Sequence, residues 1–202
     1  MNDNRDTPID SLYREGQSII CELKKANQPS LETAANASLG KSLIIAAASY
    51  FERMVCDFLL KMVDDRTNNF TPVTEFVRTK TISRQYHTFF DWEKLNANHF
   101  FNLFGKDFSD KMKNKIKESS DLEEAIKGFM EIGSQRNNLV HNDYATYPLN
   151  KTAEEIYESY KRGLRFVKKL PDLFESSRAN LSQHNATDGL FHCIYTREVR
   201  KR

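Results

Sequence analysis

Glycine and proline are scarce in this chain, with 7 and 5 among 202 residues. Few turn-forming residues favour long helices over a turn-rich sheet. Alternating β-branched segments are nearly absent too, and the few candidates, such as residues 70–81, are short and interrupted by Pro72. Aromatic residues are plentiful, with 14 Phe and 8 Tyr, which argues against disorder. The composition therefore predicts a folded, all-α protein.

Cysteine is equally sparse, and long apolar runs are missing. Cys21, Cys56 and Cys193 are odd in number and lie far apart, so they form neither a disulfide framework nor a zinc motif. The first residues lack the apolar segment of a signal peptide, and the longest apolar run, 43–48, is too short to span a bilayer. We therefore expect a cytoplasmic protein with no membrane segment, metal ion or other cofactor.

Net charge is small as well: +2 at pH 7, with a sequence pI of about 8.3. A protein that merely coats DNA or RNA is usually more basic. An enzyme that grips a short stretch of RNA does not need such an excess. The charge therefore neither demands nor forbids a nucleic-acid partner.

What the chain does contain is helical periodicity. Apolar residues at spacings of three and four predict the strongest helix from Leu31 or Ser38 to Val63, after which residues 64–69 form a loop. Two apolar stripes make this helix apolar over most of its circumference, so we expect it at the centre of the bundle. Further helices are predicted over residues 9–26, 91–103, 107–117, 120–141 and 152–174.

Two of these helices start at recognisable caps. Ser120 to Glu123 and Thr152 to Glu155 have the spacing of capping boxes. From Ser176 onward the periodicity dissolves. We therefore predict an N-terminal helix over residues 1–30, a main helical domain over 31–176 and a C-terminal tail over 177–202.

The candidate site centres on Arg136-Asn137-Asn138-Leu139-Val140-His141. Arg136 occupies a position on the apolar stripe of its helix, and Glu52 does the same on the central helix. Burying one charge alone is prohibitive, whereas two charges that meet are tolerated. We therefore expect Glu52 and Arg136 to face each other or to share a polar pocket. The alternative is an ordinary inter-helix ion pair, or charged ends that point outward.

Three more side chains complete this candidate site. Asn137 and His141, four residues apart, share a face of their helix. Arg53, next to Glu52, and Tyr144, three residues after His141, are candidates for contacts to substrate. The catalytic candidates are thus Arg136, His141, Asn137 and Glu52.

The pattern Arg136-Asn137-x-x-x-His141 resembles the Arg-x4–6-His motif of HEPN domains, in the form with a polar residue after the arginine. The helix bearing Glu52 is similar to the HEPN helix that carries an acidic residue. The likeness is strongest to stand-alone bacterial HEPN proteins of the RiboL-PSP and MAE_28990 type. It implies a four-helix core with extra helices and, for many members, metal-independent endoribonuclease activity. Tyr144 departs from the spacing of HEPN toxins that are paired with nucleotidyltransferase antitoxins.

The chemistry suits these residues. RNA cleavage through the neighbouring 2′-OH needs a base, an acid and a cation on the phosphorane. His141 suits the proton transfers and Arg136 the developing charge. Each chain offers one histidine in this motif, which is few for two proton transfers. The resemblance therefore implies a homodimer in which both motifs line one cleft.

We therefore expect an endoribonuclease that acts on RNA as a toxin or phage-defence effector, with an antitoxin or other defence-system protein as a partner. One alternative is a non-catalytic HEPN-like module that binds RNA, a nucleotide or a partner protein. A second is a scaffolding bundle in a multi-protein complex.

Overall fold

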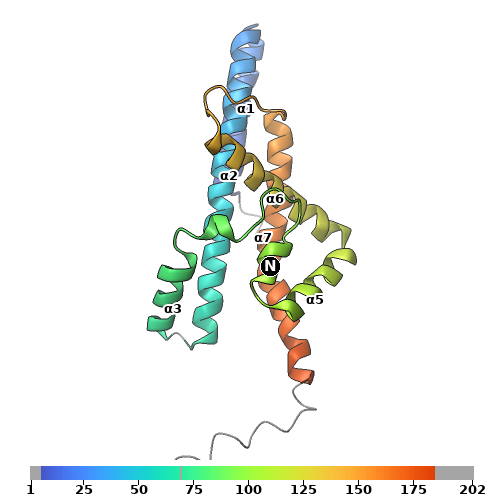
Figure 1. Ribbon diagram of the computed structural model, residues 1–202. Helices are drawn as coiled ribbons and strands as arrows, with labels where there is room; N and C mark the ends of the chain where they lie inside the picture. The colour runs from blue at the N-terminus through green and yellow to red at the C-terminus, as the bar shows by residue number, and fades with distance from the viewer. Residues whose placement is uncertain (1–5, 69, 185–202) are drawn as a thin grey trace, which may run out of the picture. The chain divides into compact units, whose positions relative to one another are not determined.

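The computed structural model describes residues 6–68 and 70–184, with side chains as far as residue 176. The chain divides into two compact units, residues 1–168 and 169–202. The described residues form helices and no strand, so the all-α prediction is confirmed (Figure 1). The α-helices are α1 (Pro8–Lys25), α2 (Pro29–Arg66), α3 (Thr71–Val77), α4 (Asn98–Asn102), α5 (Lys106–Lys117), α6 (Ser120–His141) and α7 (Ala153–His184), with η1 (Arg78–Ile82) and η2 (Tyr86–Thr88) as a π-helical and a 3-10 turn.

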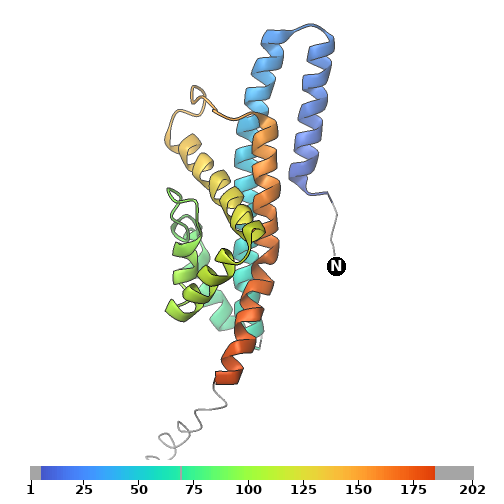
Figure 2. The same cartoon turned by 90° about the vertical axis from the view of Figure 1, so that its right-hand side faces the viewer.

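Helix α1 begins at a capping box and runs back alongside α2 (Figure 2). The backbone N–H of Thr7 donates to Asp10 Oδ2 at 2.6 Å, and the Thr7 hydroxyl accepts from the backbone N–H of Asp10. Gly16 makes the close approach to α2 possible, because a Cβ there would lie 2.4 Å from Leu39 Cδ1. The Thr7 hydroxyl also lies 2.6 Å from the Tyr160 hydroxyl, which ties the start of α1 to α7.

The central position predicted for α2 is confirmed by its burial. Its inward face is almost fully buried, with Leu43, Ile44, Ala47, Phe51 and Val55. The ring of Phe51 lies 5.3 Å from that of Phe129 on α6 and 5.5 Å from that of Tyr160 on α7. Truncating a phenylalanine of this kind costs about 3–5 kcal/mol, so this contact fixes how α2, α6 and α7 pack.

The predicted helix over residues 91–103 is wrong for its first half. Only Asn98–Asn102 is α-helical, and residues 89–97 are bends and turns. Aromatic packing explains the difference, since Phe90 stacks on Phe100 at 4.8 Å and Trp92 lies 5.9 Å from Phe129. The Asn96 side chain then accepts from the backbone N–H of Asn98 and starts the short helix there.

Helix ends also differ from the predictions in places. Helix α2 continues to Arg66, beyond the start of the predicted loop. The cap of α6 is Ser119, whose side chain accepts from the backbone N–H of Leu122, so the box predicted from Ser120 to Glu123 does not form.

The box at Thr152 is confirmed, with the Thr152 N–H donating to Glu155 Oε2 at 2.8 Å. Helix α7 passes Pro171 and extends to His184, well beyond the predicted end at 174. The three-part domain division stays a prediction. Cys193 lies outside the described residues.

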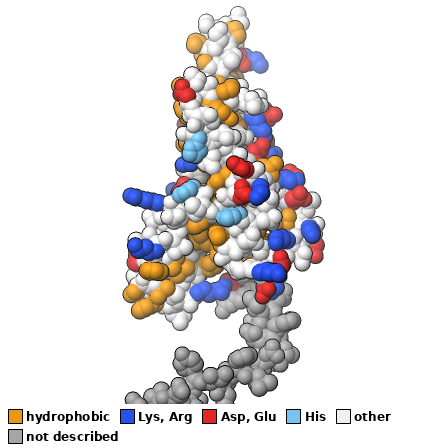
Figure 3. All heavy atoms as spheres, viewed as in Figure 1, with side chains coloured by type: hydrophobic (Ala, Val, Ile, Leu, Met, Phe, Trp, Pro, Cys, Tyr) orange, Lys and Arg blue, Asp and Glu red, His pale blue; other side chains and the backbone are white. Residues whose placement is uncertain are grey.

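Apolar side chains remain on the surface of α3 and just before it. Phe70 and Phe76 are exposed, and so is Val73 between them. Apolar side chains gather on this part of the face seen in Figure 3. Contiguous exposed apolar surface is typical of a site of protein contact. No described helix combines the length and apolarity needed to cross a membrane.

Candidate functional site

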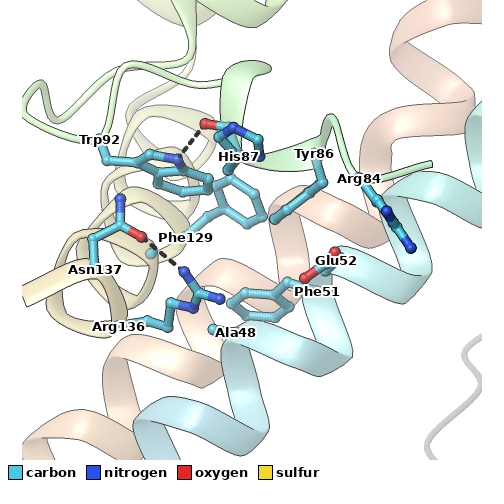
Figure 4. A pocket seen from close by; sticks show the side chains of 11 residues that line it. Ala48, Phe51, Glu52, Arg84, Tyr86, His87, Trp92, Phe129, Arg136 and Asn137 are labelled. Atoms are coloured by element: carbon cyan, nitrogen blue, oxygen red, sulfur yellow. Dashed lines mark hydrogen bonds between the residues drawn. The ribbon is translucent and has the colours of Figure 1, made fainter. Parts of the chain in front are cut away.

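A cavity of about 110 Å³ lies between α2, α6 and the segment 84–92 (Figure 4). Its floor is aromatic, with the buried side chains of Phe51, Phe129 and Tyr86. Its other lining residues are Ala48, Glu52, Arg84, His87, Trp92, Gly133, Arg136 and Asn137. Buried rings therefore meet charged and polar groups in one open pocket.

Arg136 and Asn137 enter this cavity from α6. Arg136 is half-buried, and its Nη1 donates to Asn137 Oδ1 at 3.2 Å. Ile132, one turn earlier, is fully buried and fixes the helix against the core. The sequence prediction that Arg136 lies on the core-facing stripe is therefore only half right. At Arg136 this face of α6 is no longer packed against the core but borders the open cavity, and Arg136 lines that opening.

Glu52 lines the same cavity from α2, but it is exposed rather than buried. Its neighbours on the same stripe, Ala48 and Cys56, are half-buried, because the cavity opens above this side of α2. Glu52 and Arg136 form no ion pair in the part of the chain that the structure describes. The two charges thus share a pocket without neutralising each other through direct contact.

The charge of Glu52 acts on two neighbouring groups. Burial raises the pKa of the Tyr86 phenol well above its usual range, Glu52 raises it further, and Arg136 opposes this. Burial, together with Glu52 and Asp57, raises the pKa of the Cys56 thiol to about 11. Both side chains therefore stay neutral at pH 7.

The segment 84–92 closes the cavity from outside the helices. Trp92 Nε1 donates to the backbone carbonyl of His87 at 3.0 Å, which bends the segment over the pocket. The Trp92 ring in turn lies against Gly133 of α6. Arg84 adopts a left-handed backbone conformation, with φ of 62°, and is an exposed residue at the edge of the cavity. Such a conformation is uncommon for a residue with a long side chain.

Sequence reasoning did not identify Arg84, Tyr86, His87 or Trp92 as residues of the site. Their segment has no periodicity, so nothing local indicates which side chains face the site. One signal was available: Gly133 lies on the buried face of α6, one turn before Arg136. A glycine at that position leaves room for a large partner, and Trp92 is the chain's single tryptophan.

His141 is the last residue of α6 and is exposed. It follows Asn137 by four residues and therefore shares its helix face. Leu139 is buried and anchors this last turn, whereas Val140 is exposed. His141 does not line the cavity, so the structure brings together Glu52, Arg136 and Asn137 and leaves His141 at the adjoining helix end.

The sequence matches the family model described as RiboL-PSP-HEPN over residues 10–176. The chain belongs to this HEPN family. The match begins within α1, covers α2 to α6 and ends within α7, so all the candidate residues fall inside it. No curated protein and no solved structure matches the chain.

Neither of the expected substrate contacts of this HEPN domain, Arg53 and Tyr144, lines the cavity. Lys41 Nζ donates to the carbonyls of Tyr144 and Ala145 at 2.6 and 3.1 Å, and it lies 5.3 Å from the centre of the Tyr144 ring. Arg53 is exposed, and its guanidinium lies 5.2 Å from the centre of the Tyr50 ring. Tyr144 therefore belongs to a segment after α6 that Lys41 ties to α2.

The acidic and sulfur-bearing groups of the HEPN domain do not form a metal site within the described residues. The described residues include no group of three or more His, Cys, Asp or Glu placed to hold a metal ion. Cys21 is exposed and Cys56 half-buried, and both are free thiols.

Proposed function

We propose that this HEPN protein is an endoribonuclease that cleaves RNA through attack of a neighbouring 2′-OH. The supporting observation is that Arg136, held by Asn137, lines an open cavity beside the helix end that carries His141. A cation oriented by an amide suits a phosphate, because the guanidinium presents a planar set of donors.

In the proposed reaction the 2′-oxygen attacks phosphorus, and the bond from phosphorus to the 5′-oxygen breaks. A base takes the 2′-OH proton, and an acid returns a proton to the leaving 5′-oxygen. Arg136 offsets the negative charge of the phosphorane. The products are a 2′,3′-cyclic phosphate and a 5′-hydroxyl, and the step as proposed needs no metal ion.

His141 is the group that we propose for proton transfer. Since one imidazole cannot serve two positions at once, we propose that a second copy of the chain supplies the other. The exposed apolar side chains of Phe70 and Phe76 offer surface for contact between proteins, which is compatible with a homodimer. Exposure of His141 at a helix end leaves it accessible to RNA and to a partner.

Supporting roles fall to the remaining candidates. Asn137 positions Arg136, and Glu52 acts on bound substrate, since it shares the cavity without holding the guanidinium. Arg53 and Tyr144 are proposed to contact RNA on either side of the cleaved bond. An RNase of this kind endangers its own cell, so we propose a toxin or phage-defence role with an antitoxin or another defence protein as partner.

A second candidate function is a non-catalytic module that binds RNA, a nucleotide or a protein. The observation that favours it is that His141 does not line the cavity, so cation and imidazole are not gathered in one pocket of a single chain. The two functions differ in whether RNA is cut.

The test incubates pure protein with total RNA and EDTA and compares wild type with Arg136→Ala and His141→Ala. His99→Ala is the control, because His99 is exposed and lies outside the cavity. We expect cyclic-phosphate products from wild type and from His99→Ala, and losses of about 100-fold or more in the other two. Undiminished cleavage by folded His141→Ala overturns the proposal. Tight RNA binding by wild type without any cleavage establishes the module instead.

A further inference from the structure

The cavity contains more than phosphate chemistry requires. Trp92 and His87 line it above a floor of buried rings, and Trp92 is only half-buried. Unstacked RNA bases bind to proteins largely by stacking on aromatic side chains. An open pocket with an aromatic wall next to an arginine has the composition of a nucleobase site.

The carboxylate of Glu52 contributes two hydrogen-bond acceptors to this pocket. It makes no hydrogen bond or ion pair with any other side chain that the structure describes. Figure 4 shows Glu52 and Arg84 on one side of the cavity and Trp92 and Asn137 on the other. A planar ligand between them would bring one edge to the carboxylate.

Guanine is the base whose edge fits a carboxylate. It presents two adjacent donors, the N1–H and the N2 amino group, to the two oxygens of a carboxylate. Uracil flanks its single N–H with two carbonyl oxygens. Adenine and cytosine place a ring-nitrogen acceptor beside the amino group. Each of these three bases would place at least one lone pair next to the negatively charged carboxylate, and the two would repel each other.

The two arginines suit the rest of a nucleotide. Arg136 lies in the same cavity and is the residue proposed to act on the scissile phosphate. Arg84 is exposed at the edge of this cavity, has a left-handed backbone conformation and forms no ion pair within the described residues. Conformations of this kind cost energy and cluster at ligand-binding sites. A base seated beside Glu52 therefore has cations within the same pocket for its phosphate.

We propose that this cavity is a guanine-binding subsite, in which Glu52 selects a guanosine nucleotide of the RNA and Trp92 contacts its base. The proposal rests on the proposed RNA substrate. In this proposal Glu52 is the specificity-determining residue, and the segment 84–92 contributes side chains that contact the bound nucleotide.

The single tryptophan supplies the measurement. Trp92 fluorescence is followed while wild type is titrated with the 3′-monophosphates of guanosine, inosine, adenosine, cytidine and uridine. Inosine keeps the N1–H but lacks the N2 amino group, so it isolates one of the two bonds. We expect the guanosine nucleotide to bind about tenfold or more tightly than the last three, with inosine between them. Equal binding of all five, or binding of none, overturns the proposal.

Glu52→Gln is the test variant and Asp57→Asn is its charge-matched control. Asp57 is exposed on α2, one turn beyond Glu52, and does not line the cavity. Glu52→Gln is expected to lose the preference for guanosine, whereas Asp57→Asn is expected to keep it. A preference that survives Glu52→Gln contradicts the proposal.

Mononucleotide binding needs no cleavage, so the two proposals can fail separately. Guanosine-selective binding by a protein that cuts no RNA supports the guanine subsite and contradicts the proposed nuclease activity. Cleavage of RNA with equal frequency beside all four bases supports the nuclease activity and contradicts the guanine subsite.

Discussion

The six-membered ring of Trp92 occupies the space that a side chain on Gly133 would fill. A Cβ at Gly133 would lie 1.9 Å from Trp92 Cζ3 and 2.2 Å from Cε3. Because Trp92 also donates to the carbonyl of His87, this one contact seats the segment 84–92 on α6. The cavity thus has its outer wall because α6 lacks a side chain one turn before Arg136.

Gly133→Ala is expected to push Trp92 off α6. The ring is held by its neighbours, so relief requires the segment to move. We expect the free energy of unfolding to fall by about 1–3 kcal/mol and the tryptophan emission to shift to the red as the indole meets water. Urea unfolding and fluorescence spectra measure the two effects. Ser134→Ala, at the next position, is the control.

A second variant ties this effect to the indole. Trp92→Phe shortens the ring system, so the double variant should be less destabilised than the sum of the two single changes. If the two losses in free energy of unfolding simply add in the double variant, the alanine at position 133 destabilises the protein through contacts other than the indole of Trp92.

Glu131 makes the stability of the fold depend on pH. Burial raises the pKa of this carboxyl, but hydrogen bonds from Lys151 and Ser159 and the charges of Lys151 and Arg162 outweigh burial, so the pKa lies below its ordinary value of 4.5. The folded protein therefore binds this proton less readily than the unfolded chain does. The stabilisation is present above pH 4.5 and is lost as the pH falls through the lowered pKa.

Glu131→Gln is accordingly expected to lower the free energy of unfolding by about 1.5–3 kcal/mol at pH 7. The difference in the free energy of unfolding between wild type and variant should become smaller as the pH is lowered below 4.5. Urea unfolding across this range measures it. Glu124→Gln, an exposed change on the same helix, should show no comparable gap. A constant difference at every pH would refute the linkage.

Lys41→Met is expected to release the segment after His141. Methionine keeps the length of the side chain but cannot donate to the carbonyls of Tyr144 and Ala145. The backbone N–H of Tyr147, bonded to the Asp143 carbonyl at 2.8 Å, reports on this segment. Loss of two hydrogen bonds should speed its exchange with solvent by roughly tenfold. Unchanged exchange, equal to that of a Lys61→Met control on the exposed face of α2, would argue against the tether.

The features predictable from the sequence are those that local chemistry decides. The burial of α2 follows from its apolar periodicity, and the box at Thr152 follows from a four-residue pattern. Glu52 and Arg136 come into one cavity because each is a charge placed on an apolar stripe. Their burial was overestimated, since periodicity identifies a face of a helix but not where a pocket interrupts the packing on that face.

The rest depends on contacts between segments distant in the chain. Trp92 is seated by Gly133, which lies on another helix, and residues 89–97 lose their predicted helix to ring packing against Phe100 and Phe129. No local pattern carries that information. The position of His141 outside the cavity is likewise a matter of where α6 ends relative to the pocket.

The backbone conformation of Arg84 limits which substitutions can test its role in binding. Because its φ is 62°, each substitution changes a backbone preference together with a side chain. Glycine would remove the cation and relax the turn at once, so the two effects could offset each other and hide a real contribution to binding. Asparagine tolerates the left-handed region without the freedom of glycine. Arg84→Asn therefore separates electrostatics from conformational relief and is the substitution from which a nucleotide affinity can be interpreted.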